Sequence, residues 1–287
     1  MSTSALATPA WLDSQLESHD IRIVDTRWYL TDEHQGRREY TLGHIPGAIF
    51  LDLDTDLAGD EGPGRHPLPG RQQFAEILGR AGIGNEHHAV VYDHGPGAIA
   101  ARLWWMLRWG GHGSVSVLDG GYAAWTSAGF AISTAHDSYP SAAFALSTAL
   151  TQTVDRNELL DSLGSVQLLD ARAGERYRGE VEPVDPVGGH IPTAISAPTD
   201  GNLDGTGRFR SPQELADRFV DLGVDPSEGI VNSCGSGVTA CHNILAMHIA
   251  GFPETALYPG SWSDWSTSRY PVTTGPFPGP PPTAAGS

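Results

Sequence analysis

A cysteine at position 234 stands in the stretch "IVNSCGSGVTACHN", between an apolar run and a segment with the composition of a helix. Gly235 and Gly237 follow it, with Ser236 between them and Thr239 soon after. Glycines let successive backbone N–H groups converge on an anion, and the positive N-terminal end of a helix adds to their effect. Such a turn stabilises a thiolate, the nucleophilic form of cysteine. We therefore predict that Cys234 is a nucleophile; the alternative is a small, buried apolar residue.

The composition argues against several other kinds of chemistry. All 17 basic residues are arginine, which excludes a lysine Schiff base, pyridoxal phosphate attachment and a P-loop. The formal net charge of −17 disfavours nucleic acid and anionic membranes as partners. No apolar run reaches the roughly 18 residues of a membrane span, and the N-terminal residues do not resemble a signal peptide. Two cysteines without zinc-ligand spacing predict no metal site and a reducing cytoplasm.

The chain repeats itself at offsets between 140 and 146 residues. The repeat predicts two copies of one domain, at 1–134 and 152–275, joined by a linker at 135–151 and followed by a Pro/Gly-rich tail at 276–287. The matched segments are RIVDTR (22–27) with QLLDAR (167–172), GHIPGA (43–48) with GHIPTA (189–194), AVVYDHGPGAIAARL (89–103) with GIVNSCGSGVTACHN (229–243), and VLDGGYAAW (117–125) with LYPGSWSDW (257–265).

Each copy alternates between predicted strands and predicted helices. In the second copy VQLLDA and GIVNS are typical of buried strands, and PQELADRFVDLGV is typical of an amphipathic helix ending at glycine. The alternation predicts an α/β fold of two tandem domains, each a mainly parallel sheet flanked by helices. Cys234 follows a strand and precedes a helix, where open α/β sheets bind ligands. It aligns with His94, so the first copy has the glycine turn without the thiol.

The loop CGSGVTA, the paired DAR and GHIP signatures, the later GSWSDW and the tandem organisation together resemble the two-domain rhodaneses. The loop is most similar to that of the 3-mercaptopyruvate sulfurtransferases. The resemblance covers residues 10–270 and implies two rhodanese-like domains, of which the first is non-catalytic. It implies that Cys234 takes a sulfane sulfur from a small-molecule donor, becomes a persulfide, and passes the sulfur to a thiol such as thioredoxin, or to cyanide. Such a double displacement requires no cofactor, because the backbone cradle holds both anions.

The residues of the loop bear on the choice of donor. Thiosulfate enzymes of this family carry basic residues directly after the cysteine, whereas here Gly235 and Ser236 leave a field from backbone and hydroxyl groups alone. This favours 3-mercaptopyruvate, with thiosulfate as the alternative. The resemblance implies that Arg176 binds the donor's carboxylate, a task that suits a guanidinium. The loop residues expected to bind the donor are Gly235, Gly237, Val238 and Thr239.

The family pattern has a second arginine near position 184, where this chain has Val184. Arg178 or Arg172 could substitute for it. Arg172 has a counterpart, Arg27, in the non-catalytic copy, which favours a structural role for both. By the same reasoning we expect Asp170 to support the loop rather than to react.

The resemblance also implies a proton relay through Ser236, His66 and an aspartate from the first copy. Asp54 is the best match for the aspartate, and Asp52 and Asp56 are the alternatives. The alternative for His66 is a loop histidine with no partner.

Two rival functions remain as hypotheses. A cysteine phosphatase needs an arginine six residues after the cysteine, where this chain has Ala240. A non-enzymatic sulfur-relay module would instead carry sulfur only between partner proteins. The second cysteine, Cys241, lies two helical turns or roughly 10 Å from Cys234, too far for a disulfide. We expect it to face the core, a redox role being the alternative.

Overall fold

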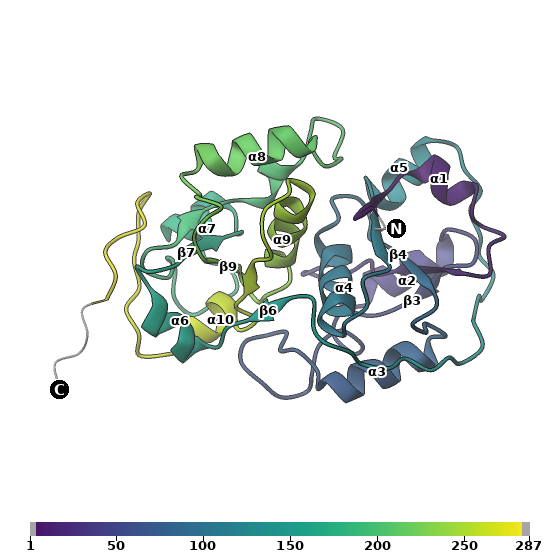
Figure 1. Cartoon of the computed structure of the whole chain (residues 1–287), viewed down its shortest axis with the longest axis horizontal. Coiled ribbons are helices and arrows are strands. Elements are labelled where there is room, and N and C mark those ends of the chain that lie inside the picture. Colours follow the sequence, from purple (N-terminus) through teal and green to yellow (C-terminus); the bar gives the residue numbers. More distant parts are fainter. Residues whose placement is uncertain (1–3, 283–287) are drawn as a thin grey trace. The chain divides into compact units, whose positions relative to one another are not determined.

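The computed structural model describes residues 4–282, and its contacts divide the chain into two compact units (Figure 1). The first unit comprises the described residues up to Asp60, together with Leu68–Thr151 and Leu203–Phe209. The second comprises Glu61–Pro67, Gln152–Asn202 and the described residues from Arg210 onward. Each unit is built on its own sheet.

The first unit is a five-stranded parallel sheet in the order β1-β5-β4-β2-β3. Every residue of β2 is buried, as expected for a parallel strand that is covered on both faces. In chain order its elements are β1 (Leu6–Ala7), α1 (Pro9–Asp13), β2 (Ile21–Asp25), α2 (Gln35–Leu42), β3 (Ile49–Phe50), α3 (Arg71–Arg80), β4 (His88–Tyr92), α4 (Ala98–Trp109), β5 (Val115–Leu118) and α5 (Gly121–Ser127).

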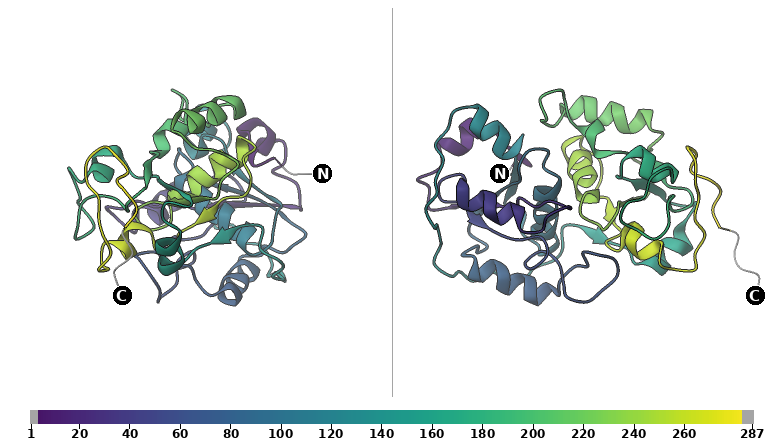
Figure 2. Two further views of the ribbon diagram at one scale, coloured as in Figure 1. Left: turned by 60° about the vertical axis from the view of Figure 1, so that its left-hand side comes forward. Right: turned by 180° about the vertical axis from the view of Figure 1, so that it is seen from behind.

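The second unit is a parallel sheet in the order β6-β10-β9-β7-β8, which matches the first sheet strand for strand. Helices lie on both sides of each sheet (Figures 1 and 2), so the predicted fold class is confirmed. Its elements are β6 (Gln152–Thr153), α6 (Arg156–Ser162), β7 (Gln167–Asp170), α7 (Gly174–Arg178), β8 (Ile195–Ser196), the 3-10 helix η1 (Thr199–Asn202), α8 (Pro212–Asp221), β9 (Ile230–Ser233), α9 (Ala240–Ile249), β10 (Ala256–Leu257) and α10 (Ser261–Trp265).

Local sequence explains where the helices of the second unit begin and what they bury. The Ser211 hydroxyl and the Glu214 carboxylate form a capping box at the start of α8, and Leu215 and Phe219 point one apolar stripe into the core. Helix α9 is buried almost throughout, which fixes the helix end that follows the Cys234 loop. Within residues 4–282 no helix combines the length and the apolar character needed to cross a membrane.

The predicted linker is packed against the first unit. Residues 135–151 contain no helix or strand. The Asp137 carboxylate accepts a hydrogen bond from the Gly47 amide (3.0 Å), and the Tyr139 hydroxyl donates to the Gly47 carbonyl (2.7 Å). The Asn85 side chain bonds the linker further along. The linker is therefore held along its length by hydrogen bonds rather than by secondary structure.

The described part of the Pro/Gly-rich tail is held to the second unit. The Thr193 amide donates to the Pro278 carbonyl (2.7 Å), and His190 Nε2 lies 3.1 Å from the Phe277 carbonyl. The end of the predicted tail, residues 283–287, lies outside the described residues.

Two short segments depart from the domain boundaries predicted from the repeat. Residues 61–67 belong to the second unit, and residues 203–209 belong to the first. The boundaries predicted from a repeat follow chain order, whereas compact units follow contacts. As a result, Arg65 and His66 belong to the same compact unit as Cys234.

Candidate active site

The Cys234 loop connects the end of β9 to the start of α9, at the carboxyl edge of the sheet. Cys234 is only 2% exposed. Its amide donates to the Ser261 hydroxyl (3.1 Å), and its carbonyl accepts from the Trp262 amide (2.9 Å), so the start of α10 fixes the loop. Gly237 has a φ of +75°, and a Cβ there would lie 2.3 Å from the Pro259 carbonyl oxygen. Glycine is therefore required at this turn.

The corresponding loop of the first unit shows what such a turn binds. The Asp93 carboxylate lies inside it and accepts hydrogen bonds from the amides of Gly95 (2.9 Å), Gly97 (3.0 Å), Ile99 (2.9 Å) and Ala100 (3.4 Å). Converging amides at a helix start form an anion-binding nest. The first copy fills this nest with its own carboxylate.

The second copy has no carboxylate at this position. Ser233 replaces the aspartate, and its hydroxyl donates to the Leu169 carbonyl (3.1 Å) in the neighbouring strand. The nest is thus available to an anion on the next residue, Cys234. In the first copy the next residue is His94, an exposed residue whose ring is tilted relative to that of Tyr29, with the ring centroids 5.3 Å apart. The two copies therefore differ at two adjacent positions, and both differences suit a thiolate in the second.

His66 and Ser236 are brought together by the segment 61–67. His66 Nδ1 lies 2.7 Å from the Ser236 hydroxyl oxygen, and both residues are buried. The Ser263 hydroxyl accepts the amide of Arg65 (3.1 Å), which holds the segment beside α10. The predicted pair is therefore in hydrogen-bonding geometry next to the nucleophile.

The aspartate predicted for the relay lies in the first unit. The Asp54 carboxylate accepts a hydrogen bond from the Trp28 indole (2.7 Å). The Asp52 carboxylate accepts from the Asp54 amide (2.9 Å), and the Asp56 carboxylate accepts from the Asp52 amide (2.8 Å). Asp52 and Asp56 thus stabilise a turn, and the role of Asp54 in the relay stays a prediction.

Asp170 and Arg172 form a buried ion pair below the loop. The guanidinium bonds both carboxylate oxygens (2.6–3.1 Å) and the Gly189 carbonyl (2.6 Å). Burial would lower the pKa of Arg172, but Asp170 and Glu182 more than offset it and the pKa is raised. The Arg172 guanidinium lies over the Trp262 ring at 4.6 Å, so Asp170 supports the loop through Arg172 and α10.

Arg172 is not a substitute for the missing second arginine. The first unit contains the same ion pair between Asp25 and Arg27 (2.6 Å), which agrees with the structural role that the repeat predicts.

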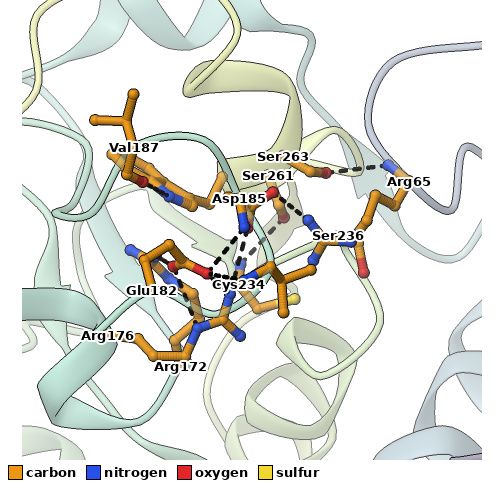
Figure 3. A network of polar contacts seen from close by, with 12 residues as sticks. Arg65, Arg172, Arg176, Glu182, Asp185, Val187, Cys234, Ser236, Ser261 and Ser263 are labelled. Atoms are coloured by element: carbon orange, nitrogen blue, oxygen red, sulfur yellow. Dashed lines mark hydrogen bonds and ion pairs between the residues drawn. The ribbon is translucent and has the colours of Figure 1, made fainter. Parts of the chain in front are cut away.

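Arg176 lies close to the loop and is held by two carboxylates (Figure 3). Its Nε and Nη2 donate to Glu182 (3.2 and 2.7 Å), and Nη2 also reaches Asp185 (3.3 Å). Burial raises the pKa of Asp185. Burial also acts on Glu182, but the hydrogen bonds from Arg176 and from the loop amides outweigh it and leave that pKa lowered. Asp185 is the costlier charge, because its burial, together with a smaller repulsion from Glu182, outweighs its contacts with the two arginines.

Arg65 is a site residue that the sequence did not indicate. Its Nη1 donates to Asp185, and its Nη2 lies 3.0 Å from the position that a Cβ on Gly235 would take. Arg176 Nη1 lies 3.7 Å from the same point. The expectation that the field of the loop comes from backbone and hydroxyl groups alone is therefore wrong. The only sequence signal was that Arg65 precedes His66.

Arg178 is not brought to the loop. Its guanidinium pairs with the exposed Glu180 carboxylate (2.8 and 2.7 Å), and within residues 4–282 it makes no hydrogen bond or ion pair with the Cys234 loop. Val184 contributes its amide, which donates to Glu182 (3.1 Å). The family's second arginine thus has no replacement on this segment.

The remaining residues of the loop make contacts that hold the loop and the start of α9 in place. The Val238 carbonyl accepts from the Cys241 amide (3.1 Å), and Thr239 caps α9 without a side-chain hydrogen bond. Cys241 is buried with its sulfur 3.4 Å from the Gly237 carbonyl, and both cysteines are free thiols. Within the described part of the chain no cluster of three or more His, Cys, Asp or Glu side chains could hold a metal ion.

Comparison with known proteins identifies the family. The model of the rhodanese-like domain matches residues 8–128 and again residues 155–268. The chain belongs to the rhodanese family. It is 45% identical over 283 residues to a probable 3-mercaptopyruvate sulfurtransferase of Pseudomonas aeruginosa, covering 96% of this rhodanese and 100% of that protein. It is 37% identical over 283 residues to the thiosulfate sulfurtransferase of Rattus norvegicus, covering 94% of each.

The solved structures agree with the sequence relatives. The crystal structure of SseA from Escherichia coli, a 3-mercaptopyruvate sulfotransferase, superposes with a TM-score of 0.82 at 32% identity. The match covers 91% of this rhodanese and 100% of SseA. The loop that carries Cys234 therefore lies on a fold used for sulfur transfer.

Proposed function

We propose that this rhodanese is an enzyme that transfers sulfur from 3-mercaptopyruvate, through a persulfide on Cys234, to a thiol or to cyanide. The observation that carries the proposal is the Arg176 guanidinium next to Gly235, directly after a cysteine whose anion nest has no internal carboxylate. A guanidinium suits the donor's carboxylate, and the nest suits the sulfur anions.

The first half-reaction moves one sulfur and one proton. The Cys234 thiolate attacks the donor sulfur, a sulfur–sulfur bond forms and the bond from sulfur to the donor's methylene carbon breaks. The electron pair leaves on that carbon as pyruvate enolate. The donor's thiol proton is transferred to the carbon, which yields pyruvate and the Cys234 persulfide anion. The loop amides hold the negative charge before and after the transfer.

The hydrogen-bonded pair of His66 and Ser236 is placed to carry the proton. A hydroxyl bonded to an imidazole at 2.7 Å can accept a proton from the donor thiol and return it to the enolate carbon. Asp54 is proposed as the carboxylate that orients the imidazole. Arg172 and Asp170 support the loop and take no part in bond making.

The second half-reaction releases the sulfur. An acceptor thiolate, such as that of thioredoxin, attacks the outer persulfide sulfur and regenerates the Cys234 thiolate; cyanide gives thiocyanate in the same way. A cytoplasmic location suits this cycle, because both cysteines are free and the nucleophile must stay reduced.

Thiosulfate is the second candidate donor. Two guanidinium groups border Gly235, so the site has the positive charge that a dianion requires. A non-enzymatic relay module remains the third interpretation, and it predicts poor turnover with every small donor.

The test is kcat/KM for 3-mercaptopyruvate and thiosulfate, with cyanide as acceptor, on the wild type and Cys234→Ser. We expect a preference for 3-mercaptopyruvate that the substitution abolishes. A preference for thiosulfate would move the donor assignment to the second candidate. Inactivity with both donors would favour the relay module.

A further inference from the structure

We propose that Arg65 is a donor-binding residue, and that it supplies from segment 61–67 the second guanidinium that position 184 lacks. The inference rests on the proposed function, because it concerns the anionic end of the sulfur donor. Its evidence is the direction of the Arg65 and Arg176 nitrogens, the buried Asp185 carboxylate that both arginines contact (Figure 3), and the closeness of both guanidinium groups to Gly235.

Each of the two guanidinium groups uses one terminal nitrogen to bond a carboxylate and has the other close to Gly235. Arg65 directs Nη1 and Arg176 directs Nη2 to the carboxylates of the site. The other terminal nitrogens, Nη2 of Arg65 and Nη1 of Arg176, adjoin Gly235 and have no hydrogen-bond acceptor among residues 4–282. Unpaired N–H donors of charged groups favour an anionic ligand. These two point to the residue that follows the nucleophile.

Asp185 sets the spacing of the two arginines. Its carboxylate is 4% exposed, and each of its oxygens is bonded by one of them. A buried carboxylate between two guanidinium groups fixes both, so that a second anion on their outer nitrogens need not order them again. Glu182 bonds Arg176 and Arg172 but not Arg65, so Asp185 is the residue that couples Arg65 to the family's carboxylate-binding arginine.

Gly235 makes room for Arg65. A Cβ on Gly235 would lie 3.0 Å from Arg65 Nη2, closer than side chains normally approach. A Cβ at 235 would therefore push the end of Arg65 away by a few tenths of an ångström. In this chain the positive charge near the nucleophile comes from outside the loop, and the absence of a side chain at 235 lets it approach closely.

The position of Arg65 in the chain links donor binding to proton transfer. Its amide is fixed by Ser263, and its neighbour His66 bonds Ser236. Segment 61–67 thus presents a cation and a proton carrier side by side. The ligand that fits is a small thiol or thio-anion with a carboxylate or an equivalent oxyanion within reach of its sulfur. We assign the oxyanion as the carboxylate of a 2-oxo acid.

The test is the KM and kcat for 3-mercaptopyruvate and thiosulfate in Arg65→Gln, Arg65→Lys and Gly235→Ala. A matched control is Arg38→Gln, which removes an exposed arginine paired with Asp32. Loss of a charge-assisted hydrogen bond should raise the KM for 3-mercaptopyruvate about 10-fold to 100-fold in Arg65→Gln with kcat within about 3-fold. The KM of Arg65→Lys should lie between those of the wild type and Arg65→Gln, because lysine keeps the positive charge but loses the two-nitrogen geometry of the guanidinium. Gly235→Ala should raise the same KM by less than Arg65→Gln does, because the end of Arg65 has to shift by only a few tenths of an ångström.

Three results would overturn the proposal. The first is an unchanged KM in Arg65→Gln for whichever donor the wild type uses. The second is a fall in kcat at constant KM, which would make Arg65 a positioning residue for His66. The third is an equal effect in Arg38→Gln. If Arg65→Gln does not fold, the KM of Arg65→Lys decides. A wild type that uses only thiosulfate contradicts the 2-oxo acid assignment, yet leaves the role of Arg65 to be decided on thiosulfate.

Discussion

The difference between Asp93 and Ser233 predicts that one substitution can inactivate the enzyme by placing a carboxylate of the chain itself in the anion nest of the Cys234 loop. Ser233→Asp would place a carboxylate where the first copy has one. The carboxylate would accept hydrogen bonds from the amides of Gly235, Gly237 and Thr239, the counterparts of the amides that Asp93 occupies at 2.9–3.0 Å. The thiolate of Cys234 would then lose its nest and gain a negative neighbour.

The size of the effect follows from the charges. Two unit charges about 5 Å apart repel by roughly 3 kcal/mol at an effective dielectric constant of about 20. Each 1.36 kcal/mol corresponds to a factor of ten, so the repulsion alone lowers reactivity by about 100-fold. Loss of the amide hydrogen bonds acts in the same direction, which makes about 100-fold the lower bound.

The assay is the rate of Cys234 alkylation by iodoacetamide, together with kcat/KM for 3-mercaptopyruvate. We expect both to fall at least about 100-fold in Ser233→Asp. Ser233→Asn is the matched control, because it has the same shape without the charge, and it should retain most of the alkylation rate. Near-UV circular dichroism establishes that each variant is folded. Equal rates in the wild type and Ser233→Asp would refute the nest as the source of thiolate stability.

Two further predictions concern histidines. His66→Ala and Ser236→Ala should each lower kcat about 100-fold with little change in KM, and the double variant should be no worse than either, because the pair acts as one proton carrier; additive losses would separate their roles. Burial lowers the pKa of His112 and of His190 below the ordinary value near 6.5. The unfolded chain then binds more protons, so the free energy of unfolding should fall as pH drops from about 7 to 5, by up to about 1.4 kcal/mol per pH unit for each histidine. Urea unfolding at several pH values measures this slope, and a flat profile, or one unaltered in His112→Gln, would contradict it.

Much of the site was predictable from local patterns and from the repeat. The apolar runs before the two glycine turns indicate buried strands. The glycine at 237 indicates a turn, because it has the positive φ that a turn requires. The repeat supplied the comparison between Cys234 and His94. The family resemblance supplied the pairing of His66 with Ser236, which the structure brings to 2.7 Å. These features could be predicted because each depends on the type of the residue itself or of its neighbours in the sequence.

Only the tertiary structure decided the contacts between residues that are distant in the sequence. Nothing near Arg65 indicates that it meets Asp185, 120 positions later, or that its guanidinium lies over Gly235. The carboxylate of Asp93 is visible in the sequence, but its position inside the loop is not. Sequence patterns record which backbone conformation and which burial a residue needs. The direction of a long charged side chain depends on where several separate segments converge, and that is fixed only when the chain has folded.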